Sequence, residues 1–327
     1  MFNIIIVGTG KAAYLHYLKY KKIGIQKIYF FDNNKNSKYI KNNNIYYSIK
    51  DLFCNKFNSK NTIVDICTPC SQFKQIINLF IDYGIKNFIV EKPFVVEKDY
   101  FKKNKDINII MIENYKYSLI TKYISNYINE NKLEIKKIFI NFSKDRREES
   151  ISKRGIANDL LIPTNFEIEM PHEIYLANYF IKNGAKYYKK ILLKDMLYNN
   201  VCLPKHGYGY IEYTQNNTEV VLESNLMVGP NKRDLQIICN DDTIINASYI
   251  NYNKDFVRQS KGVIRINKIG KEKKIFFEED DNMYYTLNDY LKNIFNENEI
   301  MKYKKEILEF SKDMSFYMNN YIYEYDK

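Results

Sequence analysis

Two residues far apart in the sequence have side chains suited to moving a proton and stabilising charge. Lys92 stands between Glu91 and Pro93 at the end of an apolar run, and His172 follows Pro171. A lysine ammonium can hydrogen-bond a substrate hydroxyl and stabilise the charge that develops on its oxygen. Pro171 suits the first turn of a helix, whose dipole favours the neutral imidazole that a general base needs. We predict that both are catalytic; the alternatives are a solvated lysine in a turn and a structural histidine.

A glycine-rich turn near the N-terminus could hold a dinucleotide. Gly8 and Gly10 follow an apolar run of strand length, and Ala13 lies in the helix pattern behind them. Gly8 permits a tight turn, Gly10 lets backbone N–H groups approach a pyrophosphate, and a small residue at 13 lets the helix pack closely on the strand. Asp32 lies about 20 residues further on, where a carboxylate can accept from ribose hydroxyls. The alternative is an ordinary strand–turn–helix without a ligand.

The apolar pattern supplies an α/β scaffold for these residues. Alternating strands and helices are typical of a parallel sheet covered on both faces, and such sheets bind ligands at the carboxyl ends of their strands. We expect strands at 2–7, 26–31, 62–67, 87–91 and 108–113, and helices at 11–22, 49–55 and 70–83.

A change of pattern after a helix at 116–131 marks a second domain. The strand-like runs that follow are joined by short turns, which favours an antiparallel sheet. We therefore predict a dinucleotide-binding domain over 1–117 and an α+β domain with a largely antiparallel sheet over 118–327. Its expected elements are strands at 134–144, 207–214, 218–228 and 234–240, and helices near 171–182, 284–296 and 301–322.

Composition narrows the classes of function. The chain has 327 residues, is 45% hydrophobic and carries a formal net charge of +11. The basic residues are scattered rather than gathered in one block, so we do not predict nucleic-acid binding, although a positive field favours anionic ligands. No apolar run approaches the roughly 18 residues of a membrane span, and the N-terminus enters a strand at once without a signal peptide. We expect a cytoplasmic protein that does not bind membranes.

The five cysteines do not predict a disulfide or metal framework. Cys67 and Cys70 form a C-x-x-C, but no second pair follows, and the other three are dispersed. Such a pair can mark a redox site or half a zinc site. We interpret it instead as two reduced thiols at a strand-to-helix turn, and we expect no metal.

These residues together resemble the Gfo/Idh/MocA family, the glucose–fructose oxidoreductase and inositol dehydrogenase group. The resemblance implies a Rossmann domain and an NAD(P)-dependent oxidoreductase that moves a hydride between nicotinamide and a secondary alcohol or ketone. Sugars, amino sugars, nucleotide sugars and cyclitols are the implied substrates. It covers nearly the whole chain and rests on the glycine turn with His16, Asp32, Cys67-Thr68-Pro69, Glu91-Lys92-Pro93, Glu113-Asn114, the His172 helix and Asn288-Asp-Tyr-Leu.

The resemblance also implies roles for individual residues. The second domain's sheet would form a wall of the substrate pocket and an interface in a homodimer or homotetramer. Asp32 would face a 2′-phosphate, so we expect NAD(H) to be favoured; Lys35 could soften this preference and keeps NADP(H) open. Substrate contacts are expected from Lys92, Tyr115, Glu169 and His172. Cofactor contacts are expected from Gly8, Thr9, Gly10, Lys11, Ala12, Asp32, Asn33, Thr68, Pro69, Glu91 and Asn114.

Some positions depart from the family pattern. Ile168 stands four residues before His172, where an Asp is common, and Glu169 is the neighbour that could replace it. Phe73 occupies the usual position of a His. His206 is a weak candidate for substrate contact. The basic residues before the His172 helix could contact a phosphate, but we favour a solvated loop for Arg146, Arg147 and Arg154.

Two further classes of function stay open beside the dehydrogenase. An imine or enamine reductase on the same scaffold would depend less on Lys92 as a partner of an alkoxide. A non-catalytic NAD-binding regulator is mildly favoured by Ile168 and disfavoured by Lys92 and His172. The regulator would bind NADH without turnover, whereas an enzyme should lose turnover but not NADH binding on Lys92→Ala.

Overall fold

The structure is a computed structural model that describes residues 2–34, 39–40, 45–54, 57–154, 162–182, 184–252 and 258–324. It divides the chain into two compact units. The first consists of Met1–Asn114 and Met283–Asp313, and the second of Tyr115–Asn282 and Met314–Lys327. The first break lies close to the boundary expected at 117, but a later segment returns to the first unit, which the sequence did not indicate. No helix among the described residues is long and apolar enough to cross a membrane.

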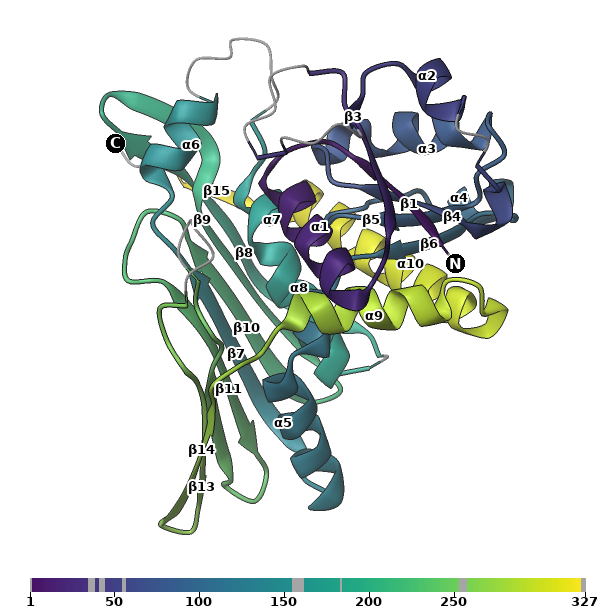
Figure 1. Ribbon diagram of the computed structural model, residues 1–327. Coiled ribbons are helices and arrows are strands. Elements are labelled where there is room, and N and C mark those ends of the chain that lie inside the picture. Colours follow the sequence, from purple (N-terminus) through teal and green to yellow (C-terminus); the bar gives the residue numbers. More distant parts are fainter. Residues whose placement is uncertain are drawn as a thin grey trace. The chain divides into compact units, whose positions relative to one another are not determined.

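A parallel six-stranded sheet forms the centre of the first unit (Figure 1). The strand order is β3-β2-β1-β4-β5-β6. Strands β2 and β3 are added on one side of β1 and the next three strands on the other side, so the order of the strands switches between β1 and β4. Ligands of open α/β sheets bind at such a switch point, beyond the carboxyl ends of the strands. The strands are β1 (Asn3–Val7), β2 (Lys27–Phe31), β3 (Ile45–Tyr46), β4 (Thr62–Ile66), β5 (Asn87–Val90) and β6 (Asn108–Met111).

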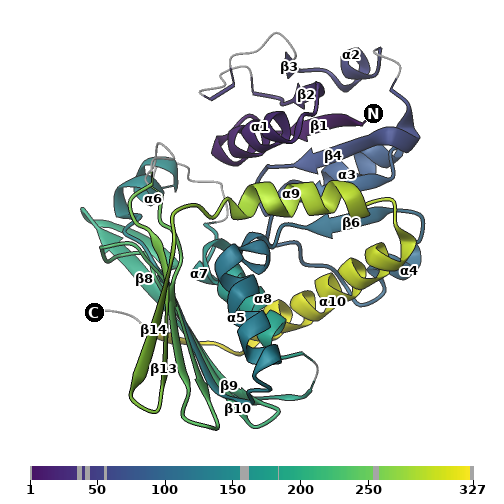
Figure 2. The ribbon, with the colours of Figure 1, turned by 60° about the horizontal axis from the view of Figure 1, so that its bottom comes forward.

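Helices cover both faces of this sheet, which explains why its strands are nearly continuous apolar runs. In both views α1 (Lys11–Ile23) and α9 (Asn282–Asn293) lie on one face, and α3 (Phe73–Ile81) lies on the other (Figures 1 and 2). The Lys22 ammonium sits over the ring of Tyr284, 4.8 Å from its centroid, and joins α1 to α9. The remaining helices are α2 (Ile49–Phe53), α4 (Tyr100–Lys103) and α10 (Glu297–Asn320), with short 3-10 turns at Ser59–Asn61, Cys70–Gln72 and Asn114–Tyr117.

A nine-stranded sheet forms the second unit, in the order β14-β13-β12-β11-β7-β10-β9-β8-β15. It is largely antiparallel, as predicted; the pairs β7–β10 and β8–β15 are parallel. Five of its strands, β8 and β12 to β15, were not among the predicted examples. The strands are β7 (Ile135–Ser143), β8 (Lys186–Tyr198), β9 (Val201–Gln215), β10 (Thr218–Asn225), β11 (Lys232–Cys239), β12 (Ile244–Ser248), β13 (Gly262–Lys268), β14 (Lys271–Phe277) and β15 (Ile322–Glu324).

Three helices lie against one face of this sheet in both views: α5 (Leu119–Glu130), α7 (Asn165–Ile168) and α8 (Met170–Phe180) (Figures 1 and 2). A fourth, α6 (Arg147–Arg154), follows β7. A side chain at Gly209 in β9 would collide with Met170, so a glycine there lets α8 approach the sheet closely. This packing fixes the first turn of α8, which carries His172.

Candidate active site

The glycine turn has the geometry that a pyrophosphate requires. Gly8 has a φ of +100°, in the left-handed region, and a side chain there would put Cβ 3.1 Å from the carbonyl oxygen of Cys67. Gly10, the N-terminal cap of α1, has an ordinary φ of −77°, and nothing lies within 4 Å of a Cβ built on it. The fold therefore requires a glycine at 8 but not at 10. The open space at Gly10 fits a bound group that must approach the backbone.

The first turn of α1 offers its N–H groups to that space. No side chain caps this helix, and its first turn, which contains Lys11 and Ala12, has no acidic residue. Uncapped N–H groups and the positive end of the helix dipole favour an anion at this position. A dinucleotide pyrophosphate would be held by these groups and by the turn at Gly8–Gly10.

Asp32 follows β2 beside the glycine turn. Its Oδ2 accepts a hydrogen bond from the Thr9 hydroxyl at 2.5 Å, and its Oδ1 accepts from the backbone N–H of Asn34 at 2.8 Å. The carboxylate is thereby fixed at the carboxyl edge of the sheet, where a ribose would lie. Asn33, next to it, is exposed. Lys35 lies outside the described residues.

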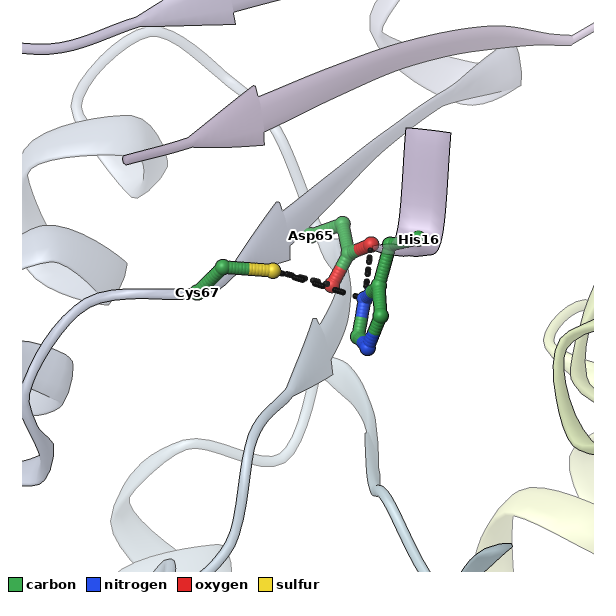
Figure 3. A group of neighbouring side chains, drawn as sticks. All are labelled: His16, Asp65 and Cys67. Atoms are coloured by element: carbon green, nitrogen blue, oxygen red, sulfur yellow. Dashed lines mark hydrogen bonds and ion pairs between the residues drawn. The ribbon is translucent and has the colours of Figure 1, made fainter. Parts of the chain in front are cut away.

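A buried polar cluster lies behind the turn, as Figure 3 shows. His16 comes from α1, Asp65 from β4, and Cys67 from the end of that strand. Nδ1 of His16 lies 2.8 Å from Oδ2 of Asp65 and 3.4 Å from the Cys67 sulfur. The other ring nitrogen, Nε2, lies 3.0 Å from Oε1 of Glu91. The imidazole thus bridges two carboxylates beneath the ligand edge of the sheet.

The charges of this cluster are set by its members. Burial lowers the pKa of His16, but Asp65 and Cys67 oppose this strongly enough to place the pKa well above its usual value. Burial raises the pKa of Glu91, yet contact with His16 and the charge of Lys92 leave it lowered. Burial and Asp65 raise the pKa of the Cys67 thiol to about 12. These shifts favour the protonated form of the His16 imidazole, which lies between the carboxyl groups of Asp65 and Glu91, and a Cys67 thiol that keeps its proton.

Lys92 follows this cluster directly in the chain. The backbone N–H of Glu91 donates to Ile66 in β4, and that of Lys92 donates to the Glu91 carboxylate at 3.2 Å. The Lys92–Pro93 peptide bond is cis, a form that the sequence had left open. Lys92 therefore lies just beyond β5, at the same sheet edge as Gly8 and Asp32.

The other predicted cofactor residues lie at that edge too. Thr68 and Pro69 follow β4, and Cγ2 of Thr68 would lie 3.4 Å from a Cβ at Gly8. Asn114 follows β6 at the start of a 3-10 turn. The preceding backbone N–H, of Glu113, donates to the Tyr290 hydroxyl of α9. The first unit thus gathers the whole predicted cofactor set at the carboxyl ends of its strands.

In the second unit, His172 occupies the first turn of α8, as predicted. Its Nδ1 lies 2.9 Å from the hydroxyl of Tyr175, one turn further along the helix. That hydroxyl accepts a hydrogen bond from the backbone N–H of Tyr115 at 3.1 Å. The ring of Tyr115 packs edge-on against the imidazole, with centroids 5.2 Å apart. Tyr115 is therefore beside His172 in this unit. Tyr175 was not among the predicted residues, although its spacing of three residues from His172 is a usable signal.

Glu169 has a different environment from the one expected. It is 1% exposed, and its carboxylate lies 3.1 Å from Nη2 of Arg146 and 2.5 Å from Nη2 of Arg233. Ile168 packs in an apolar cluster with Met196, Leu203 and Leu226. An apolar residue at 168 is thus explained by its core position, and Glu169 is held by two arginines.

Three other readings of the sequence are corrected or explained. The predicted solvated loop is wrong for Arg146, which pairs with Glu169; Arg147 pairs with Asp145 near the surface, and the side chain of Arg154 lies outside the described part. His206 is buried between the Pro163 carbonyl and the Ser150 hydroxyl, so it has a structural role rather than a substrate contact. Phe73 is a core residue at the start of α3.

Comparison with known proteins gives a likeness of fold. No protein-family model matches the chain, and no curated protein matches it. It is similar in structure to KijD10, a 3-ketoreductase from Actinomadura kijaniata in complex with NADP and TDP-benzene, with a TM-score of 0.75 at 9% identity over 100% of this chain and 99% of that chain.

Two further solved structures agree. A dehydrogenase (MviM) from Clostridium difficile has a TM-score of 0.67 at 15% identity, covering 97% of this chain and 99% of that chain. A probable oxidoreductase, yhhX, has a TM-score of 0.71 at 15% identity, covering 98% and 97%. The predicted fold class is therefore confirmed: the chain shares the fold of these oxidoreductases, a Rossmann-like parallel-sheet unit followed by a unit with a largely antiparallel sheet.

Proposed function

We propose that this chain is an NAD(P)-dependent oxidoreductase that moves a hydride between nicotinamide and a secondary alcohol or ketone. The observation that carries the proposal is Gly10. The fold tolerates a side chain there, since a Cβ would meet nothing within 4 Å, so the glycine is explained by a ligand that approaches the backbone at the start of α1. The uncapped helix end and Asp32 suit the pyrophosphate and a ribose of a dinucleotide.

The proposed chemistry assigns one role each to His172 and Lys92. A bound nicotinamide supplies the hydride acceptor or donor. In the oxidative direction the imidazole of His172 takes the proton of the substrate hydroxyl, and the ammonium of Lys92 stabilises the oxygen as charge develops. Tyr175 holds the His172 ring: if Nδ1–H donates to its hydroxyl oxygen, Nε2 is left as the base. In reduction the same groups act in reverse.

The proposed substrate is a sugar, an amino sugar, a nucleotide sugar or a cyclitol. The resemblance of the motifs to sugar dehydrogenases supports this class. The similarity of fold to KijD10 supports it as well, because that protein is a 3-ketoreductase whose complex contains TDP-benzene. A panel of keto-sugars, nucleotide sugars and cyclitols, followed through the absorbance of NADH and NADPH, tests the proposal. Oxidation or reduction of the cofactor with at least one member supports it; dinucleotide binding without turnover across the panel favours the regulator.

We further propose that NAD(H) is preferred over NADP(H). The Asp32 carboxylate is fixed by Thr9 and by the backbone of Asn34, so a 2′-phosphate on the ribose would meet a negative charge that cannot move away freely. The structure of KijD10 contains NADP, so the proposed cofactor preference of this chain differs from the cofactor in that protein of similar fold. The ratio of dissociation constants for NADH and NADPH tests it, and Asp32→Ser should shift that ratio toward NADPH by about tenfold or more.

A further inference from the structure

The Glu91 carboxylate contacts both the buried ring of His16 and the backbone of Lys92. Its Oε1 lies 3.0 Å from Nε2 of His16, and its Oε2 accepts a hydrogen bond from the backbone N–H of Lys92 at 3.2 Å. All three residues belong to the first unit. One carboxylate therefore connects helix α1 to the backbone of the lysine to which we assign the stabilisation of charge on the substrate.

The backbone at Lys92 lies just beyond the regular hydrogen bonds of β5. The N–H of Glu91 still donates to the carbonyl of Ile66 in β4, at 3.0 Å. Two residues after Lys92, the N–H of Phe94 donates to the sulfur of Met111 at 3.3 Å, and sulfur is a weak acceptor. A carboxylate is a strong acceptor for a backbone N–H. The Glu91 side chain thus fixes the chain where the strand no longer does.

His16 in turn holds the Glu91 carboxylate in place. The imidazole is 0% exposed, and its Nδ1 lies 2.8 Å from Oδ2 of Asp65, a contact that Figure 3 shows. The ring is therefore held on both sides, by Asp65 and by Glu91. Burial raises the pKa of Glu91, but contact with His16 and the charge of Lys92 outweigh this and lower it, so the group accepts as a carboxylate. A chain of contacts runs from Asp65 in β4 to the backbone of Lys92.

We propose that Glu91 is a positioning residue for Lys92 and that His16, held by Asp65, orients Glu91. The proposal rests on the proposed function, because it explains how the Lys92 ammonium is kept in place for the reacting oxygen. A catalytic group must be held within about 0.5 Å of its productive position, which requires supporting contacts around it. A misplacement of about 1 Å can cost a hundredfold in rate. Neither Glu91 nor His16 transfers a proton in this scheme.

Two simpler roles for Glu91 lead to different expectations. A carboxylate that served only the fold or only the cofactor would affect activity equally with and without the lysine. A carboxylate that acts through Lys92 has no further effect on kcat once the lysine side chain is gone. A double-mutant cycle with Lys92→Met therefore separates the positioning role from the other two.

The experiment measures kcat, KM and the dissociation constant of NADH in the full chain, with the best substrate of the panel. The variants are Glu91→Met, Glu91→Gln, Lys92→Met and the double variant Glu91→Met/Lys92→Met. Asn87→Ala is the control at the other end of β5, where the buried amide of Asn87 donates to the Thr62 carbonyl at 3.2 Å. Its loss weakens the same strand away from Lys92. Denaturant unfolding identifies the variants that are folded under the assay conditions.

We expect Glu91→Met to lower kcat about tenfold or more, with little change in KM, because a charge-assisted hydrogen bond to the Lys92 backbone is lost. Glu91→Gln should lose less than about threefold, since its amide oxygen still accepts that N–H. In the Lys92→Met background, Glu91→Met should change kcat by less than about twofold. Asn87→Ala should lower the free energy of unfolding and keep kcat.

Two variants of His16 test the outer contact. The short amide of His16→Asn reaches toward Asp65 but not Glu91, whereas the longer amide of His16→Gln reaches toward Glu91. If His16 orients Glu91, the folded His16→Gln protein should keep a kcat at least about threefold above that of His16→Asn. Equal kcat values in the two variants would remove His16 from the proposal. If neither variant folds, the Glu91 variants decide the inference.

The inference and the proposed function fail in different ways. Wild-type kcat in Glu91→Met, or an undiminished loss in the Lys92→Met background, overturns the positioning role and leaves the oxidoreductase standing. A rise in the NADH dissociation constant that matches the loss of activity assigns Glu91 to the cofactor instead. A wild type that binds NADH but turns over no member of the panel removes the oxidoreductase and, with it, the role of Glu91.

Discussion

The imidazole of His16 and the carboxylate of Glu91 form an ion pair across the first unit, with Nε2 3.0 Å from Oε1. Because Nδ1 of the same ring binds Asp65, one histidine in α1 connects β4 to the residue that precedes Lys92. The ring is 0% exposed and Glu91 is 16% exposed, so loss of the imidazole would leave carboxylates unpaired in the interior.

We predict that His16→Gln lowers the free energy of unfolding by about 3–5 kcal/mol, the usual cost of removing one partner of a buried pair. Lys74→Gln removes an exposed pair, with Glu97 at 2.9 Å, and should cost less than about 1 kcal/mol. Denaturant unfolding of both variants measures the difference. If both variants lowered the free energy of unfolding by the same small amount, the His16 ion pairs would not be important for stability.

The same histidine predicts a pH dependence. A pKa raised in the folded state means that the folded protein holds a proton that the unfolded chain releases above about pH 6.5. The stabilisation is therefore complete below about pH 6.5 and is lost as pH rises toward the raised pKa of His16. Histidine NMR titration should find one of the three rings protonated well above pH 6.5, and that signal should be missing in His16→Gln. Titration of all three rings near or below pH 6.5 would contradict this.

Three glycine-to-alanine variants distinguish a glycine required for stability from one required for NADH binding. Gly10→Ala should keep wild-type stability but weaken NADH binding about tenfold or more, because its Cβ enters only the proposed ligand space. Gly24→Ala, at a φ of +97° in open space, should cost about 1 kcal/mol without affecting NADH. Gly8→Ala, at +100° and against Cys67, should lose both. Wild-type NADH affinity in Gly10→Ala would remove the main support for the cofactor site.

Tyr175 should act through His172. Tyr175→Phe removes the hydroxyl that contacts Nδ1 at 2.9 Å while keeping the ring in place. A neutral hydrogen bond contributes about 1 kcal/mol, so we expect kcat to fall about five- to tenfold, with an altered pH profile and little change in KM. Tyr179→Phe, on the same helix, is the matched control. An equal loss in both variants would assign Tyr175 a packing role only.

Much of the first unit could be predicted because its central strands, such as β1, β4 and β5, are buried on both faces and read as apolar runs. The short, half-buried β3 gave no such signal and was not predicted. The second sheet was harder to predict. In β8, register shifts next to Lys190 and Met196 interrupt the alternation that reveals a strand. β14 begins with four consecutive charged residues, all exposed, so its first half shows no alternation of polar and apolar residues. The apolar residues of segment 283–313 recur at helical spacing, so the sequence predicts helices with one buried face. That pattern does not say which sheet this face packs against.

Some residues of the candidate site could be predicted from local sequence signals, and others could not. The residues at strand ends, such as Gly8, Asp32 and Lys92, have local spacing signals, and the structure places them at one sheet edge. Arg146 was misjudged because a charged turn normally lies in water, and its buried partner Glu169 is remote in sequence. Arg233 has no local signal of function. Asp65 offered one, as a lone acid inside an apolar strand.

The most direct test of the central claim compares turnover with cofactor binding in Lys92→Met. The account predicts that kcat with the best substrate falls at least about a hundredfold, because the group that stabilises the developing charge is gone, while the dissociation constant of NADH stays within about twofold. Lys86→Met, an exposed lysine before the same strand, should keep both values. Undiminished turnover in Lys92→Met, or a wild-type protein that binds no nicotinamide dinucleotide, would contradict the account.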